Sequence, residues 1–376
     1  MRALPEFPLW KTARPPVTKK WLAAGSLITL LAGGGAALLR GAGRDSITIF
    51  TLMLASLVVI ALLWLCRLVY YRASLHHATT WQQAVEHEEK RWWQKHQSTL
   101  ALRDVVLIGP AGSETSDWEL VLSRERRPPE QQQEAGGKTL RIARTFSSDI
   151  SAREQQMASS LVLLWQKRQD EAVGDFAGVF WLGSEPAWQS FRSQMAVTFP
   201  LVTLPELPES WKGEETLSRI VALLRNDEKQ QFLLAGCHSC AADSGRVLPA
   251  GESAVLWRMG ADGPVVMTRG EVFSASGHEA LKEVSARALK QSELEDVPDA
   301  CLLFSHPEVP QLAETGWNVS HHLQDNYWGY VGHMQPLIVI SLAAIQARQQ
   351  QQPCGWIAAD PQHTLALGIV KPHGKG

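Results

Sequence analysis

Two long uncharged apolar runs near the N-terminus stand out in the hydrophobic pattern. They extend from Trp21 to Leu39 and from Ile47 to Cys66. Each approaches the length of about 20 apolar residues that a helix needs to cross a bilayer. A signal peptide accounts for the first run but not for the second, and two buried helices of a soluble core are the alternative. We therefore expect a transmembrane hairpin over residues 21–71.

Basic residues predict the orientation of this hairpin. Those that precede the first run are Arg2, Lys11, Arg14, Lys19 and Lys20. Arg67 and Arg72 follow the second run, and the intervening loop holds only Arg40 and Arg44. Loops rich in Lys and Arg stay in the cytoplasm. We expect a bacterial inner-membrane protein whose cytoplasmic tail (residues 1–20) and C-terminal part lie on the same side.

The pattern changes after the second run. Residues 72–98 are polar, and the spacing of Trp81, Val85, Glu88 and Trp92 predicts a juxtamembrane helix. Beyond residue 99, short apolar runs alternate with helical patterns. The predicted strands are 104–109, 119–123, 178–183, 231–236, 253–259, 264–270, 300–305 and 365–370. The predicted helices are 151–167, 214–225, 278–291 and 336–349, and 124–138 is a polar loop. This alternation predicts an α/β layered domain with a largely buried sheet.

Composition narrows the possible functions. The formal net charge is −2 over 376 residues, which gives no electrostatic reason to expect nucleic-acid binding. Five cysteines, one of them inside an apolar run, do not suggest a disulfide framework, in keeping with a reducing cytosol.

Three stretches carry a resemblance to a known family. The first is "LLAGCHS" followed by Gly251, Glu252, Ala254 and Leu256; the others are "DACLLFSHPEV" and "GYVGHMQPLIVISLAAIQ". In order and spacing these stretches resemble thiolase-like β-ketoacyl synthases over about residues 102–372. The resemblance implies a layered α-β-α domain over 99–376 with two related halves, about 99–262 and 263–376, and a possible homodimer through a strand near the nucleophile.

The catalytic residues that the resemblance implies are only partly present. A cysteine nucleophile belongs between Val197 and Thr216, where the sequence has none. His306 and His333 match the two histidines, and Trp328 occupies the place of the lysine. We therefore expect His306 and His333 to be vestigial and the protein not to be an enzyme. The alternative is an acyltransferase or condensing enzyme that uses both histidines with an unorthodox nucleophile.

His333 stands just before the apolar run that begins at Pro336, and Pro suits a first helical turn. We interpret the imidazole as held there by the fold. Cys237 and Cys240 have a C-x-x-C spacing, but a zinc ribbon needs a second pair, and a redox pair should open a helix. They are candidates for metal or redox chemistry, although ordinary residues at a strand end explain them as well. No cofactor is expected.

Together these features predict a membrane-anchored, non-catalytic scaffold or adaptor. The whole chain is also similar to accessory inner-membrane proteins of bacterial type VI secretion systems. That resemblance implies protein partners, either secretion-system components or an effector, in addition to the lipid around the hairpin.

Overall fold

The computed structural model describes residues 5, 7–38, 46–169, 173–305, 309–360 and 362–374. The chain forms two compact units, one made of Arg2–Gln94 and one that begins at Lys95 and runs to Gly376.

The N-terminal unit contains two helices, α1 (Thr18–Leu38) and α2 (Ser46–His96). They approach closely at Gly33, where an added β-carbon would lie 2.7 Å from Sδ of Met53. The second apolar run and the predicted juxtamembrane helix form one continuous helix, α2. Within the described ranges, α2 is the one helix long and apolar enough to cross a membrane. Leu39 lies outside these ranges, and a two-helix membrane hairpin stays a prediction.

The C-terminal unit contains two groups of five strands with the same order. The first group consists of β1 (Leu100–Ile108), β4 (Gly178–Leu182), β5 (Glu209–Ser210), β6 (Phe232–Ser239) and β7 (Glu252–Gly260). The second consists of β8 (Val265–Met267), β10 (Ala300–Leu303), β11 (His322–Leu323), β12 (Cys354–Ala359) and β13 (Leu365–Pro372), and β9 (Glu271–Phe273) also pairs with β13. The orders are β5-β4-β6-β7-β1 and β11-β10-β12-β13-β8, so each reads third, second, fourth, fifth, first.

The direction of the strands repeats as well. Strand β7 is antiparallel to both β6 and β1, and β13 is antiparallel to both β12 and β8. A short antiparallel pairing of Leu100–Leu102 with β8 joins the groups into one 11-stranded sheet. The predicted pair of related halves is therefore confirmed by the topology.

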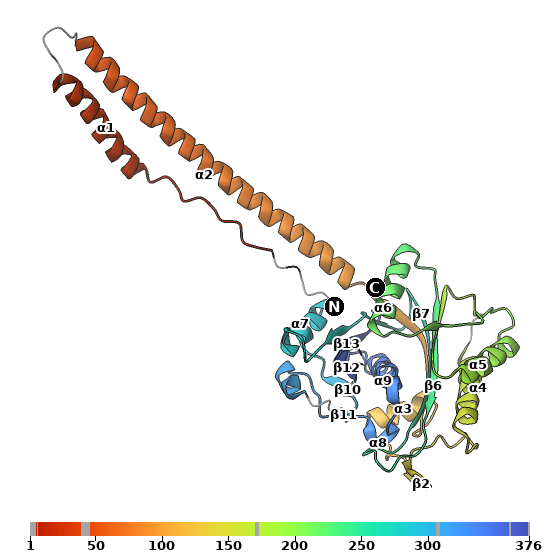
Figure 1. The fold of residues 1–376 in the computed structure, drawn as a ribbon. Coiled ribbons are helices and arrows are strands. Elements are labelled where there is room, and N and C mark those ends of the chain that lie inside the picture. The colour runs from red at the N-terminus through yellow and green to blue at the C-terminus, as the bar shows by residue number, and fades with distance from the viewer. Residues whose placement is uncertain are drawn as a thin grey trace. The chain divides into compact units, whose positions relative to one another are not determined.

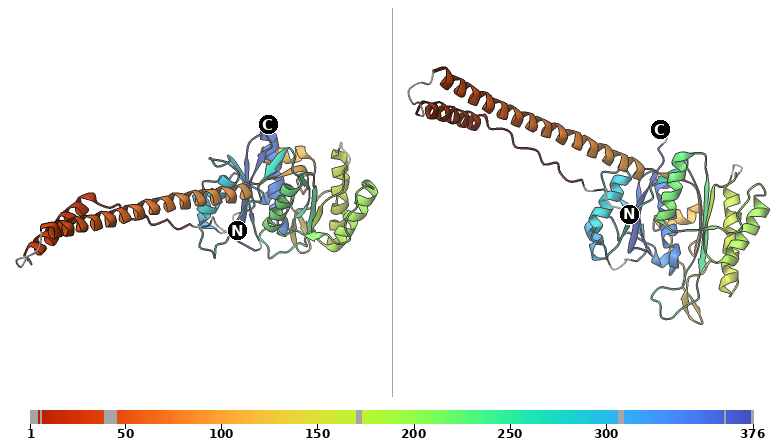
Figure 2. Two further views of the ribbon diagram at one scale, coloured as in Figure 1. Left: turned by 90° about the horizontal axis from the view of Figure 1, so that it is seen from above. Right: turned by 45° about the horizontal axis from the view of Figure 1, so that its top comes forward.

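Helices cover both faces of each half-sheet (Figures 1 and 2). The outer face of the first half carries α4 (Ile150–Arg168) and α5 (Glu185–Thr198). The outer face of the second carries α7 (Leu281–Gln291) and the 3₁₀ helix η1 (Pro310–Thr315). Between the halves lie α3 (Thr115–Leu122), α6 (Glu214–Asn226) and α9 (Gln335–Gln350). Two short helices, α8 (Asp325–Trp328) and η2 (Gly332–Met334), precede α9.

Helix α9 is apolar on every side, and this composition matches its central place. Every residue from Leu337 to Ala347 is buried. By contrast, α6 buries a single stripe that includes Leu217, Ile220 and Leu224. A helix that is apolar on every side must be buried on every side. The space between the two half-sheets provides this burial.

The predicted strand at 119–123 is wrong. Residues Thr115–Leu122 form α3, with Trp118, Val121 and Leu122 buried at helical spacing. Asp117 caps the N-terminus of this helix: its Oδ2 accepts hydrogen bonds from the backbone N–H groups of Ser113 and Glu114, each at 3.0 Å. A short apolar run does not distinguish a strand from a buried helix. The polar loop 124–138 also contains most of a hairpin, β2 (Gln132–Glu134) and β3 (Gly137–Thr139).

A charge placed in α9 should unfold the C-terminal unit. Ile340 is 1% exposed, so Ile340→Asp buries a carboxylate without a partner and should cost more than about 4 kcal/mol. Gln349→Asp, at an exposed position of the same helix, is the matched control and should leave the melting temperature nearly unchanged. Thermal melting of the detergent-solubilised protein measures both. Equal melting temperatures would contradict the central burial of α9.

Candidate functional site

The two halves present two equivalent helix starts. Helix α6 follows β5, and α9 follows β11, which are the third strands of their halves. A β-carbon on Gly213, at the start of α6, would lie 3.8 Å from Oδ2 of Asp360, which follows β12. A β-carbon on Gly332, before α9, would lie 3.3 Å from Nε2 of His238 on β6. Each inner helix thus starts beside the fourth strand of the opposite half.

The start of α6 carries carboxylates. Its first turn contains Glu214 and Glu215. Glu214 Oε1 lies 3.5 Å from Arg269 Nη1 and accepts a 2.6 Å hydrogen bond from Ser218. A thiol is absent from this stretch of sequence, which is where the family resemblance placed the nucleophile. This helix start therefore has no nucleophile of the expected type.

The start of α9 is held by a close backbone approach. The N–H of Gly251 donates to the carbonyl of Tyr330 at 2.9 Å, and the N–H of Tyr330 donates to Pro249 at 2.8 Å. A β-carbon on Gly251 would lie 2.0 Å from the carbonyl oxygen of Trp328. Only glycine fits there, since no other residue lacks the β-carbon.

The residue after Gly251 is Glu252, whose carboxylate is held by several hydrogen bonds. It is 0% exposed and accepts hydrogen bonds from Ser239 Oγ (2.8 Å), the Ile142 backbone N–H (2.8 Å) and Arg153 Nη2 (2.8 Å). Arg141 Nη1 lies 3.3 Å from the same carboxylate. Burial acts to raise the pKa of Glu252, but the hydrogen bonds from Arg153, Ile142 and Ser239 hold it below its ordinary value.

A thiol and two imidazoles lie in or beside the segment that leads into α9. Cys240 is partly exposed, and its Sγ lies 3.7 Å from the carbonyl oxygen of Tyr330. The His238 ring lies 6.5 Å from the Tyr330 ring, centroid to centroid. The guanidinium of Arg246 lies 4.3 Å from the Tyr330 ring centroid. His333, in η2, is exposed. We refer to Cys240, His238, Tyr330, Arg246 and His333 as the α9 cluster.

Both key groups of the α9 cluster rest in neutral form. Burial lowers the pKa of His238, and nearby His333 and Arg246 lower it further, against the opposite effect of Glu154. Its Nε2 is buried and has no hydrogen-bond partner within the described residues. Burial raises the pKa of Cys240, while Arg246 and Arg141 act to lower it. A neutral imidazole can act as a general base, and a protonated thiol becomes a nucleophile when it loses its proton.

The other cysteines are in different surroundings. Cys237 points to the outer face of the first half, where its Sγ lies 3.5 Å from the carbonyl oxygen of Glu154, so the C-x-x-C thiols do not face one another. Burial raises the pKa of Cys237 and Cys301, and that of Cys354 to about 12. Cys66 is exposed on α2. Across the described ranges, no three His, Cys, Asp or Glu side chains gather as a metal site requires.

The remaining candidates from the sequence are placed as follows. His306 lies outside the described residues. Trp328, at the expected position of the lysine, is 0% exposed and stacks on Trp118 with ring centroids 5.0 Å apart. Gly109 makes room for this stack, because its β-carbon would lie 2.3 Å from the Trp328 ring. Trp328 therefore belongs to the core.

Sequence reasoning missed His238, Tyr330 and Arg246. A signal was present for His238, because residues 238 and 240 alternate with 237 and 239 on a strand, which places His238 and Cys240 on the same side. Tyr330 and Arg246 had no comparable signal, since a backbone contact between distant segments brings them together.

Comparison with known proteins supports the fold. No family model matches the chain, and no curated protein matches it. Among solved structures, "The ishigamide ketosynthase/chain length factor" is similar with a TM-score of 0.50 and 10% identity, over 73% of this chain and 100% of that one. "PfaC Keto synthase-Chain length factor" is similar with a TM-score of 0.52 and 10% identity, over 74% of this chain and 43% of that one. The C-terminal unit has the thiolase-like fold, as predicted.

The prediction that the protein is not an enzyme is contradicted. Both structures named above carry the word ketosynthase in their titles, and this chain shares their fold. The prediction rested on the missing cysteine at the start of α6. The structure places another thiol, Cys240, beside the segment that leads into α9, the equivalent inner helix, so the missing residue does not exclude catalysis.

Loss of the Glu252 carboxylate should destabilise the α9 cluster and change the acid sensitivity of the fold. Glu252→Gln leaves the buried guanidinium of Arg153 without its carboxylate partner and removes one of the two carboxylates beside Arg141, so it should cost about 3 kcal/mol or more. Because the folded pKa of Glu252 is lowered, its stabilising contribution is complete above the pKa of a free glutamate and is lost as the pH falls through the folded pKa.

Melting temperatures measured between neutral and acidic pH test this prediction. The difference between wild type and Glu252→Gln should be large at neutral pH and should shrink toward acid. Glu209→Gln, which removes only an exposed pair with Arg219, should cost about 1 kcal/mol or less. A difference that stays constant with pH would argue against an ionised Glu252.

Proposed function

We propose that the protein is a membrane-anchored acyltransferase or condensing enzyme that accepts an acyl chain on Cys240. The observation that carries the proposal is the partly exposed Cys240 thiol, whose Sγ lies 3.7 Å from the carbonyl oxygen of Tyr330 in the segment before α9. His238 is two residues away in the chain, and its Nε2 has no hydrogen-bond partner within the described residues. The thiolase-like fold is consistent with it. No other cysteine of the C-terminal unit is exposed or partly exposed.

The chemistry follows from the resting protonation states. Nε2 of His238 takes the thiol proton of Cys240 as the sulfur attacks the carbonyl carbon of an acyl thioester. The bond from that carbon to the leaving sulfur breaks, and the leaving thiolate takes the proton back from His238. Cys240 then carries the acyl group as a new thioester. Arg246 and Arg141 favour negative charge on the sulfur as it forms.

Acyl labelling tests this assignment. Incubation with a butyryl thioester of N-acetylcysteamine should add one butyryl group to Cys240, detected by mass spectrometry of peptides. Cys240→Ser should carry no thioester label. Cys66→Ser is the matched control, because Cys66 is exposed but lies in α2, and it should leave the label on Cys240 unchanged. A wild-type protein that stays unlabelled at Cys240 while folded would contradict the proposal.

The role of His238 gives a separate prediction. His238→Asn should slow labelling by about 100-fold or more, the usual contribution of a general base, with little change in melting temperature. In the wild type, the labelling rate should fall as the pH drops through the pKa of His238, which lies below the ordinary histidine value, because the protonated ring accepts no proton. A labelling rate that is independent of His238 would exclude it as the base.

The cellular setting is proposed from the sequence. The length and composition of α2 suit a membrane anchor, and the basic residues favour a cytoplasmic location for both termini. Fusions of alkaline phosphatase to residues 44 and 376 test this: activity only at 44 is expected, and activity at 376 would contradict it. An adaptor role in type VI secretion and a homodimer rest on the resemblances alone, and co-purification from the native membrane tests them.

A further inference from the structure

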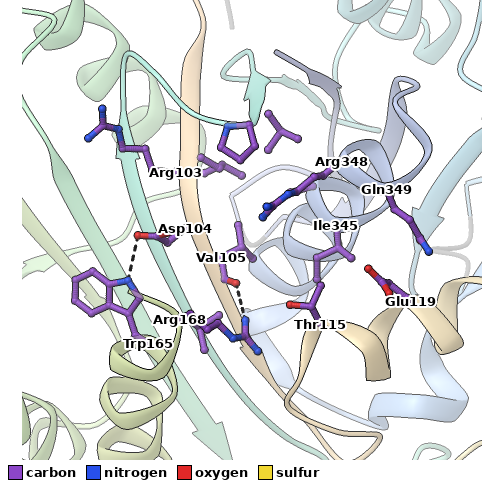
Figure 3. A pocket seen from close by; sticks show the side chains of 15 residues that line it. Arg103, Asp104, Val105, Thr115, Glu119, Trp165, Arg168, Ile345, Arg348 and Gln349 are labelled. Carbon is purple, nitrogen blue, oxygen red and sulfur yellow. Dashed lines mark hydrogen bonds between the residues drawn. The ribbon is translucent and has the colours of Figure 1, made fainter. Parts of the chain in front are cut away.

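A cavity lies at the opposite end of α9 from the α9 cluster. It has a volume of about 670 Å³, within the usual range for small-molecule sites. Its walls come from β1, the start of α3, the end of α4, β8 and the end of α9 (Figure 3). We refer to it as the β1 cavity.

The β1 cavity exists because β1 has a strand partner along only part of its outer edge. Strand β1 pairs with β7 as far as Ile108, but with β8 only through Leu102. Beyond Leu102, the outer edge faces the cavity. The carbonyl of Val105 points there and accepts a hydrogen bond from Arg168 Nη1 at 3.2 Å. The N–H of a residue in an antiparallel strand points to the same edge as its carbonyl, so the Val105 N–H is a donor directed at the cavity.

Two guanidinium groups face the same space. Arg168 is fixed by its bond to Val105 and by a 2.6 Å bond from Nη2 to the carbonyl of Ser113. Arg348, in the last turn of α9, points over Val105 from the opposite side (Figure 3). Its guanidinium makes no hydrogen bond or ion pair with the described residues. Arg168 is held in place and Arg348 is unpaired within the described residues, so both can donate hydrogen bonds to one ligand in the cavity.

The acidic side chains near the cavity leave the charge of Arg348 available, whereas Arg168 and Lys167 share Glu114. Asp104 accepts from Gln169 (2.6 Å) and Trp165 (3.1 Å) and lies 3.3 Å from Arg258 Nε, so its charge is already neutralised. Glu114 lies 3.6 Å from Arg168 but 2.9 Å from Lys167. Glu119 lies on the side of Gln349, away from Arg168 (Figure 3).

The rest of the wall is apolar and includes Val106, Val265 and Ile345. We propose that the β1 cavity binds a phosphate monoester whose organic part is short and apolar. The two arginines and the Val105 N–H suit a phosphate, since a guanidinium binds phosphate oxygens through paired donors. The apolar wall suits the organic part. This proposal does not depend on the acyl-transfer chemistry of Cys240.

Titration calorimetry on the full chain in zwitterionic nanodiscs tests the site, with butyl phosphate as the probe and empty nanodiscs as the blank. Butyl phosphate should bind more tightly than inorganic phosphate, because only the ester contacts the apolar wall. Arg348→Gln should weaken butyl phosphate binding by about tenfold or more, the usual effect of losing a hydrogen bond to a charged group. Arg225→Gln, the matched control, changes an exposed arginine in the last turn of α6 and should leave the affinity unchanged.

Three results would overturn the proposal: no binding of butyl phosphate by the wild type, equal affinity in wild type and Arg348→Gln, or an equal loss in Arg225→Gln. Inorganic phosphate that binds as tightly as butyl phosphate would overturn the apolar part of the assignment. Labelling of Cys240 by the butyryl thioester should persist in Arg348→Gln, so failure of this site and failure of the acyl-transfer proposal are distinguishable.

Discussion

The backbone contact between residues 249–251 and 328–330 connects the two halves of the C-terminal unit at the candidate site. The contact consists of two backbone hydrogen bonds. It requires glycine at position 251, because a β-carbon there would lie 2.0 Å from the Trp328 carbonyl oxygen. On one side, the contact fixes the chain that leads into α9. On the other, it continues into Glu252, which two arginines bind. The burial of α9, the position of His333 and the surroundings of Cys240 all depend on this contact.

The two inner helices are related by the repeated strand order, yet their starts have diverged in chemistry. The start of α6 carries two glutamates and a partner arginine, which favours neither a thiolate nor an oxyanion. The start of α9 has a thiol, imidazoles and a guanidinium nearby and no acidic residue in its first turn. Since a helix N-terminus stabilises negative charge, only the second start has surroundings that assist a thiol nucleophile. The internal repeat of the fold thus gives two equivalent helix starts whose surroundings differ in charge.

The sequence allowed the fold to be predicted better than the site. The strands around 231–236 and 253–259 and the apolar helix 336–349 were predictable, because burial on both faces leaves an unbroken apolar run. The prediction of a strand at 119–123 was wrong because the hydrogen bonds that Asp117 accepts cap a helix there. At the site, Cys240 and His333 were singled out separately. Nothing in the sequence indicates that Cys240 lies beside the segment that leads to His333, because this depends on a contact between segments about 90 residues apart in sequence.

The relation between the α9 cluster and the β1 cavity is set by the length of α9. Its 16 residues extend about 24 Å at the rise of an α-helix, so one short ligand cannot reach both sites. Direct electrostatic influence across that distance is small once solvent screens it. Any influence of an occupied β1 cavity on Cys240 would therefore require α9 to move as a body. Buried residues from Leu337 to Ala347 and the 2.7 Å bond between Trp257 and Ser341 oppose such a movement. The packing that makes α9 central thus favours two sites that work independently.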